Sequence, residues 1–405
     1  MTRTSKYISL IMMLIGTYLL VKNQAILSVW VEALIKNAGL MTLLLSVPLL
    51  SIIFHFEDFS SCISNFASKH INTSFKFYMF TLILAHLLGI ILNMAAIPMV
   101  NKLLENISKY YPKKMFYKAL TRGFVLAKLW SPSFMAVAVS LQYSGLQWYM
   151  YAPFGILLSV VGIAMTLITT KITVKETENN CLKDAEINNK NQPDNSGGLI
   201  KTVVIAASLL ILIICFQYLS GQSILVVIPL VSIVFPIFLA ALLKKFSIFK
   251  ARFKDYFNTT LPHMNNEIVL FTAVGFLGYA LNISGLDKYI NLIITSIGIQ
   301  SAIIFIIVII SLIFILSMIG LDPILSISAI SIAYSAGAIP LSQLQLAAIF
   351  SVGYFGYTIC SPFSGLALTL CGLRNENPLD VCININLVFY IMFICVSSLV
   401  IAMIP

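Results

Sequence analysis

The sequence predicts an all-α polytopic membrane protein that contains two inverted-topology repeats. Of its 405 residues, 59% are hydrophobic and only 10% are charged, which is far more apolar than a soluble protein of this length. Many apolar stretches reach the roughly 20 residues of helix that cross a bilayer. Both halves of the chain also interrupt such stretches with polar residues and proline at corresponding places, which is the sequence pattern of internal repeats.

A single hydrophilic stretch, residues 175–199, divides the chain and is predicted to be a flexible cytoplasmic linker. Residues 1–174 form the expected first repeat, with a re-entrant hairpin near 76–104 and a broken span at 118–143. Residues 200–221 are a connecting span. Residues 222–405 form the expected second repeat, with a hairpin near 300–340 and a broken span at 346–372. The prediction is about nine spans plus the two hairpins.

The two broken spans carry the clearest match between the halves. Ser131-Pro132 and Ser361-Pro362 each lie inside an apolar segment, and Gly123 and Gly353 precede them at equal distance. A proline after serine can simply kink a span. Two such pairs at matched positions favour a pair of functional helix breaks instead.

Loop charge predicts that the repeats are inverted. The connector after the first hairpin is rich in lysine and ends at Arg122, whereas the matching connector, residues 324–346, has no Lys or Arg. The positive-inside bias therefore places equivalent loops on opposite sides of the membrane. The resulting topology has a cytoplasmic N-terminus and an external C-terminus in a bacterial plasma (inner) membrane.

Broken membrane helices expose backbone groups that lipid would not tolerate, so such groups line protein cavities. Half-helix N-termini attract anions, and loose carbonyls at half-helix C-termini coordinate sodium. The hairpin tips and the breaks are therefore expected to meet as one substrate site near the midplane. Its polar members are the hydroxyls at Ser131, Ser133, Ser317, Ser361 and Ser364.

Lys128 and Asp322 are isolated charges within long apolar regions, where a charge is costly. Lys128 is expected either to give an anionic substrate a counter-charge or to extend to the cytoplasmic interface. Asp322 has three interpretations: it binds a coupling cation or proton, it neutralises Lys128, or it caps the helix that begins at Pro323. His86 is either a proton relay or a hydrogen-bonded interface residue, and Glu267 is expected in the first turn of a span.

Absent motifs and overall charge narrow the function classes. The sequence has no Walker A, HExxH or GxSxG motif, so we expect neither an ATP-driven pump nor an enzyme. The net charge of +10 is topological rather than a sign of nucleic-acid binding, because the basic residues gather in loops. The aromatic residues Trp130, Trp148 and Tyr149 are interpreted as interfacial anchors.

The segments Asn93-Met-Ala-Ala-Ile-Pro98 and Ser361-Pro-Phe-Ser-Gly365 resemble the hairpin tip and the proline-containing break of the ion transporter superfamily. That superfamily includes the divalent anion/sodium symporters and the large membrane subunit of tripartite periplasmic dicarboxylate transporters. The resemblance implies an elevator-type transport unit, with Asn93 contacting substrate or sodium. It also implies that the loops at Ser131 and Ser361 complete the cation sites. Neither tip has the intact Ser-Asn-Thr sequence, and the second tip has Ser317 and Asp322 instead.

The sequence thus predicts a secondary active transporter that couples a sodium or proton gradient to movement of a small organic anion. The alternatives are an uncoupled permease or channel on the same scaffold and a non-transporting membrane subunit. Substrate would contact Asn93, Lys128 and the five serines, whereas Asp322, Asn93, Ser131 and Ser361 would serve the coupling ion. We expect no cofactor beyond sodium, and partners limited to a small anionic solute, the lipid bilayer and a second copy in a homodimer.

Overall fold

The computed structural model describes residues 3–56, 63, 67, 71–174, 197–285, 301–335, 341–374 and 377–404. These residues form helices joined by short turns, and no strand occurs among them. Residues 175–196 of the expected linker lie outside the described residues, as do the last residues of the expected second hairpin, 336–340.

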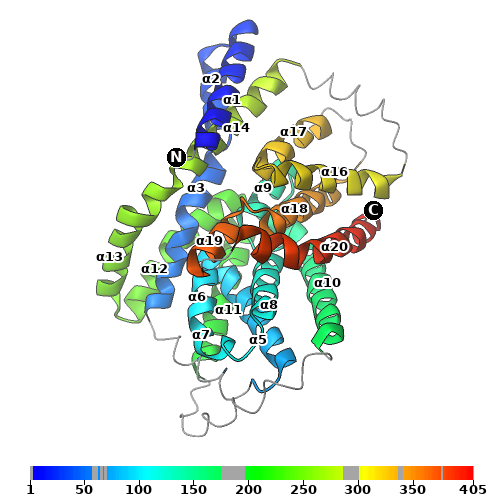
Figure 1. Ribbon diagram of the computed structural model, residues 1–405. Coiled ribbons are helices and arrows are strands. Elements are labelled where there is room, and N and C mark those ends of the chain that lie inside the picture. The colour runs from blue at the N-terminus through cyan, green and yellow to red at the C-terminus, as the bar shows by residue number, and fades with distance from the viewer. Residues whose placement is uncertain are drawn as a thin grey trace.

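The described residues of the first half of the chain form the following helical elements (Figure 1). They are α1 (Arg3–Lys22), α2 (Leu27–Ile35), α3 (Ala38–Ser46), η1 (Val47–His55), α5 (Ser74–Leu92), η2 (Asn93–Ala95), α6 (Ala96–Leu103), α7 (Glu105–Ser108), α8 (Lys113–Ala127), α9 (Met135–Ser144) and α10 (Trp148–Val174).

The second half begins with α11 (Gly197–Ser220) and α12 (Ile224–Leu242). It continues through α13 (Phe246–Asp255), η3 (Tyr256–Thr260), η4 (Leu261–Met264), α14 (Asn265–Ile283), α16 (Ala302–Met318), α17 (Pro323–Ser335), α18 (Gln343–Cys360), α19 (Gly365–Arg374), η5 (Leu379–Ile383) and α20 (Asn384–Ala402).

Six helical stretches of the described chain are long and apolar enough to cross a membrane: Leu27–His55, Ser74–Leu103, Trp148–Thr170, Ile224–Leu242, Gln343–Leu373 and Leu379–Ala402. Shorter apolar helices accompany them. The protein is therefore an all-α polytopic membrane protein. The stretch Ser74–Leu103 coincides with the first expected hairpin, and the expected span 118–143 is divided between α8 and α9.

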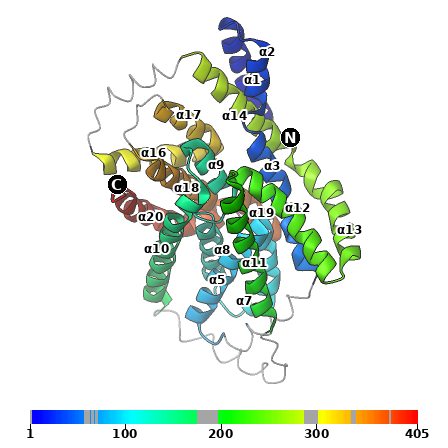
Figure 2. The same cartoon turned by 180° about the vertical axis from the view of Figure 1, so that it is seen from behind.

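The helices fall into two packing groups. In the outer group, α1 and α2 pack on α14, and α12 packs on α3 and η1. In the inner group, α5 packs on α8, α9 and α16 pack on α18, and α18 packs on α20. Figures 1 and 2 show α1, α2 and α14 at one end of the molecule and α12 and α13 along one flank, with the inner helices beside them.

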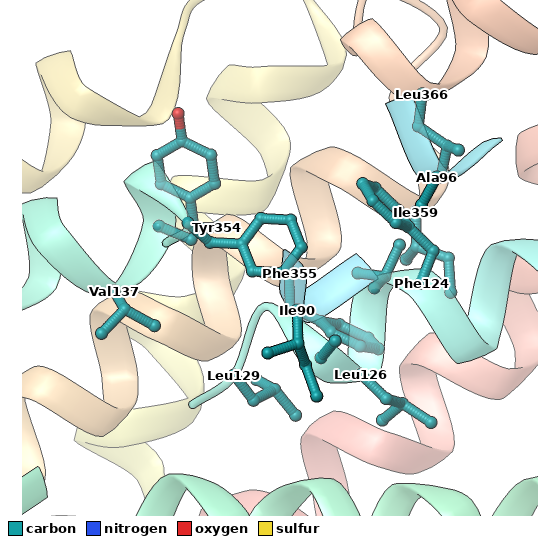
Figure 3. Packing of buried hydrophobic residues seen from close by; sticks show 14 of the residues in the cluster. Ile90, Ala96, Phe124, Leu126, Leu129, Val137, Tyr354, Phe355, Ile359 and Leu366 are labelled. Carbon is teal, nitrogen blue, oxygen red and sulfur yellow. The ribbon is translucent and has the colours of Figure 1, made fainter. Parts of the chain in front are cut away.

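Within the inner group the two halves pack reciprocally. The terminal helix α10 of the first half contacts α18, and α20 of the second half contacts α8. Likewise, α6 contacts α19 and α17 contacts α9. Figure 3 shows part of the resulting apolar core, which contains Phe124 and Leu126 of the first half together with Phe355 and Ile359 of the second.

The matched glycines explain how closely the inner helices approach. A Cβ on Gly123 would lie 2.2 Å from the backbone oxygen of Leu82 on α5, so only glycine allows this α5–α8 contact. A Cβ on Gly353 would lie 2.9 Å from the side chain of Ile313 on α16. The sequence match between the two glycines therefore corresponds to equivalent helix pairs, α5 with α8 and α16 with α18.

Candidate functional site

The two Ser-Pro breaks share two backbone hydrogen bonds. The amide of Ser131 donates to the carbonyl of Ala127 at 3.0 Å, and the amide of Ser361 donates to that of Tyr357 at 3.0 Å. Three residues into each turn, the amides of Phe134 and Ser364 donate back to the serine carbonyls at 3.2 and 3.1 Å. Proline lacks the N–H that would continue the helix. The helix α18 ends at Cys360, directly before Ser361, whereas α8 ends at Ala127 and a turn of three residues leads to Ser131.

Each break is fastened to the turn of a helical hairpin. In the first half, Ser133 Oγ donates to the carbonyl of Ile90 at 2.7 Å, and Asn93 Nδ2 donates to the carbonyl of Ser133 at 2.9 Å. In the second half, Ser361 Oγ donates to the carbonyl of Ser317 at 2.9 Å. The polar residues that the sequence places at the tips and breaks therefore do meet, in two pairs.

The first hairpin turns at Asn93. Its φ of 50° and ψ of −130° lie in a region that side chains rarely adopt, and α5 and α6 pack against each other on either side of it. The second hairpin turns at Gly320, with φ of 92°. There Asp322 Oδ1 accepts a bond from the amide of Ile324 at 3.0 Å, so the carboxylate caps α17, as one of the three interpretations predicts.

Lys128 joins the two halves. Its Nζ donates to Oγ1 of Thr358, a buried residue of α18, at 3.3 Å. The ammonium also lies over the rings of Phe124 and Phe134, 5.3 and 5.4 Å from their centroids. The side chain thus points into the protein, and the interpretation in which it extends to the interface is wrong. Among the described residues Lys128 forms no ion pair with Asp322, but the two charges interact electrostatically, so the interpretation in which Asp322 neutralises Lys128 stays a prediction.

The predicted serines are buried and bonded within the protein. Ser131 and Ser133 share a hydroxyl contact of 3.1 Å, Ser317 Oγ donates to the carbonyl of Phe314, and Ser364 Oγ donates to that of Thr358. None faces hydrocarbon. Asn93 and Ser133, however, also line a cavity.

That cavity has a volume of about 470 Å³ and lies between the outer and inner groups. Its walls include η1 and η2, the first break, and the segment from α13 to η4. Arg252 and Asp255 line it as an ion pair of 3.3 Å, and His55 lines it as well. A second cavity of about 250 Å³ also lies at the boundary of the two groups, among α9, α14 and α17.

Two aromatic residues of α10, Trp148 and Tyr151, donate hydrogen bonds to backbone carbonyls of the first break. Trp148 is buried and its Nε1 donates to the carbonyl of Trp130 at 2.9 Å, so its interpretation as an interfacial anchor is wrong. The hydroxyl of Tyr151, also fully buried, donates to the carbonyl of Leu129 at 2.7 Å. Pairs of aromatic residues with polar tips, directly after a broken span, are the signal that could have revealed this role.

His86 and Trp130 form a hydrogen-bonded pair beside these residues. Trp130 Nε1 donates to His86 Nε2 at 3.3 Å, and His86 Nδ1 lies 3.2 Å from the carbonyl of Gly123. Both ring nitrogens are therefore engaged, as the interpretation of His86 as a hydrogen-bonded residue in a helix interface predicts, and Trp130 is half-buried. Glu267 is exposed in the first turn of α14, as expected.

Asn37, which the sequence analysis did not select, connects the two packing groups. It is fully buried, and its Nδ2 donates to the carbonyl of Phe271 on α14 at 3.0 Å. Its Oδ1 accepts from Gln142 at 2.7 Å and from Tyr143 at 3.3 Å, both on α9. An isolated asparagine beside apolar segments gives no signal of such distant partners.

These features define a polytopic membrane protein in which two broken helices meet inside the fold. The chain has a membrane-transporter fold, similar to that of the YdaH transporter from Alcanivorax borkumensis (TM-score 0.63, 13% identity, 97% of each chain covered). It is also similar to MtrF from Neisseria gonorrhoeae, described within a class of antimetabolite efflux pumps (TM-score 0.56, 12% identity, 93% of this chain and 83% of that one). No protein-family model and no curated protein matches the sequence.

Proposed function

We propose that the protein is a secondary active transporter that couples a sodium or proton gradient to movement of a small organic anion across the bacterial plasma membrane. The observation that carries the proposal is the pair of matched Ser-Pro breaks, each hydrogen-bonded to a hairpin and joined to each other through Lys128 and Thr358. Irregular backbone at membrane depth is tolerated where it surrounds a site. The two structural neighbours, which are named as a transporter and an efflux pump, support the same class.

The charge distribution supports an anionic substrate. Lys128 carries a positive charge at the first break without an ion-pair partner in the described chain. The neighbouring cavity of about 470 Å³ includes Asn93 and Ser133 and falls in the range of roughly 300–1,000 Å³ typical of small-molecule sites. In this proposal the substrate binds beside the first break, in the cavity that Arg252 lines, and Lys128, which does not itself line the cavity, supplies a counter-charge from within the break.

The coupling ion belongs near the second hairpin. Asp322 is half-buried at the turn, and carbonyl groups at broken helices such as those at Ser131 and Ser361 are of the kind that coordinates sodium, although each of these two also accepts one amide hydrogen bond. A cation there would interact favourably with the carboxylate. Protonation of Asp322 would serve the same role in a proton-coupled cycle.

An elevator-type cycle is consistent with the two packing groups, since both cavities lie at the boundary between them. In the proposed cycle the inner helices move as a unit against the outer helices, and the two repeats have inverted topology. This mechanism would place the protein in or near the ion transporter superfamily.

The decisive experiment is reconstitution in proteoliposomes after a ligand screen. Small carboxylates and antimetabolites are first tested for thermal stabilisation of the purified protein in sodium and in choline buffer, because a ligand of the folded state raises its melting temperature. The ligand found is then followed under an imposed sodium or proton gradient. Gradient-driven accumulation is expected. Flux without accumulation would indicate an uncoupled permease, and no flux for any stabilising ligand would indicate a non-transporting subunit.

A further inference from the structure

A separate cavity of about 540 Å³ opens between the first turns of α5, α8 and α20 and the last turns of α10. It lies among inner helices only and shares no lining residue with the cavity at Asn93. By the positive-inside bias, the connector that leads into α8 places this cavity at the cytoplasmic surface.

Three basic residues on one face of α8 lead into the cavity. Lys114, Lys118 and Arg122 follow at four-residue spacing, which puts them on the same helical face. Lys114 is exposed, Lys118 is half-buried and Arg122 is buried, with 6% exposure. Positive charge therefore extends from the surface to the base of the cavity.

Arg122 is held rigidly by neutral groups. Its Nε donates to Asn386 Oδ1 at 3.1 Å, Nη1 to Thr166 Oγ1 at 2.9 Å and Nη2 to the carbonyl of Ile385 at 3.0 Å. Its Cζ also lies 4.5 Å from the ring centroid of Phe389. Tyr78, which lines the cavity, also hydrogen-bonds to Arg122, and a guanidinium has five N–H donors, so these four neutral partners do not use all of them.

No described acidic residue neutralises this charge. No Asp or Glu of the described chain lines the cavity, and none forms an ion pair with the three cations. Asp380 lies one turn before Asn384, which lines the cavity. Its carboxylate accepts a hydrogen bond from the side-chain amide of Asn384 at 2.6 Å. The cavity is thus a cationic site that suits an anion.

The apolar rim indicates which anion the cavity takes. Val388 and Met392, which line it on α20, are 70% and 37% exposed, and Ile391 beside them is 52% exposed. An exposed apolar stripe next to a basic pocket at a membrane surface matches a ligand with a phosphate group and acyl chains. Free phosphate would use the cations but not the stripe.

We propose that this cavity binds the phosphate headgroup of an anionic phospholipid, with the acyl chains lying on the exposed face of α20. The guanidinium of Arg122 provides the fixed inner contact, and Lys114 and Lys118 provide the outer ones. The lipid would hold α8 and α20, which belong to different repeats, at their cytoplasmic ends.

The test titrates short-chain phosphatidylglycerol into the intact protein in neutral detergent and measures the dissociation constant by thermophoresis. Short-chain phosphatidylcholine and inorganic phosphate are titrated in parallel. The double variant Lys114→Gln/Lys118→Gln is expected to bind phosphatidylglycerol roughly thirtyfold more weakly. Each cation near a membrane surface strengthens binding of an anionic lipid by about five- to sixfold, and the two factors multiply. The matched control Lys102→Gln/Lys109→Gln removes equal charge from the same connector outside the cavity and should bind normally.

Equal affinity for phosphatidylcholine, or equal weakening in the control variant, would refute the site. Inorganic phosphate that binds as tightly as phosphatidylglycerol would assign the cavity to a free anion and reject the lipid. If the glutamine variant melts at a lower temperature without lipid, the charge-preserving Lys114→Arg/Lys118→Arg replaces it. That variant must retain the affinity of the unmodified protein for the proposal to stand.

Discussion

The ammonium of Lys128 lies 3.3 Å from the hydroxyl of Thr358, and this hydrogen bond links the first broken helix directly to the second. Thr358 lies in the last turn of α18, and its own carbonyl accepts a hydrogen bond from the hydroxyl of Ser364 across the second break. A charge in the first half of the chain is therefore hydrogen-bonded to the helix that ends at the break of the second half. This link is the simplest physical means by which a ligand at one break could influence the second.

Removing this link should weaken substrate binding. Lys128→Gln deletes the charge, and a charge-assisted hydrogen bond of about 1.5–3 kcal/mol corresponds to a ten- to hundredfold rise in the apparent substrate constant. Thr358→Val keeps the shape but removes the acceptor, whereas Thr358→Ser retains it. Transport kinetics of the three variants separate the two contributions. An unchanged constant in Lys128→Gln would exclude a contact between Lys128 and substrate.

Asp322 can be tested as a charge separately from its role as a cap. Asparagine caps helices about as well as aspartate, so Asp322→Asn should keep the bond from the Ile324 amide and the melting temperature. It should nevertheless abolish gradient-driven accumulation. Asp322→Ala should in addition lose about 1 kcal/mol of stability. Normal accumulation by Asp322→Asn would leave the carboxylate with the capping role alone.

The matched glycines should differ in their tolerance of alanine. A methyl group on Gly123 meets backbone, which cannot yield, whereas one on Gly353 meets the movable side chain of Ile313. Overpacking costs about 1–3 kcal/mol, and we expect Gly123→Ala at or above the upper end and Gly353→Ala near the lower end. Denaturant midpoints in detergent would show the order, and the reverse order would contradict the packing described for α5 and α8.

The hydroxyl of Tyr151 should matter for stability because it satisfies a carbonyl that the first break releases. Tyr151→Phe leaves the oxygen of Leu129 without this donor in a buried place, at a cost of about 1–3 kcal/mol. Tyr149→Phe, on the same helix but 51% exposed, is the control and should be neutral. Equal midpoints for the two variants would mean that another group satisfies the carbonyl.

Local sequence patterns predicted the two broken helices better than they predicted the residues of other helices that hydrogen-bond to them. The Ser-Pro pairs and the glycines before them specified equivalent turns and equivalent helix contacts, because proline and glycine act through their own backbone. Asn37, Trp148 and Tyr151 were missed, because their partners lie on other helices and depend on the tertiary arrangement. The number of membrane spans is hard to predict for a similar reason, because kinks and breaks divide helices that composition alone predicts to be continuous.

The bonds of Arg122 have a consequence for biosynthesis. Its partners Asn386 and Ile385 are synthesised 264 and 263 residues later, so the guanidinium enters the nascent protein long before those acceptors exist. Until α20 emerges from the ribosome, the guanidinium has to be solvated by water, lipid headgroups or an insertion factor, because an unsolvated charge in the bilayer costs free energy. A prematurely terminated polypeptide would keep that exposed cation, which gives cellular proteases a chemical mark of incompleteness.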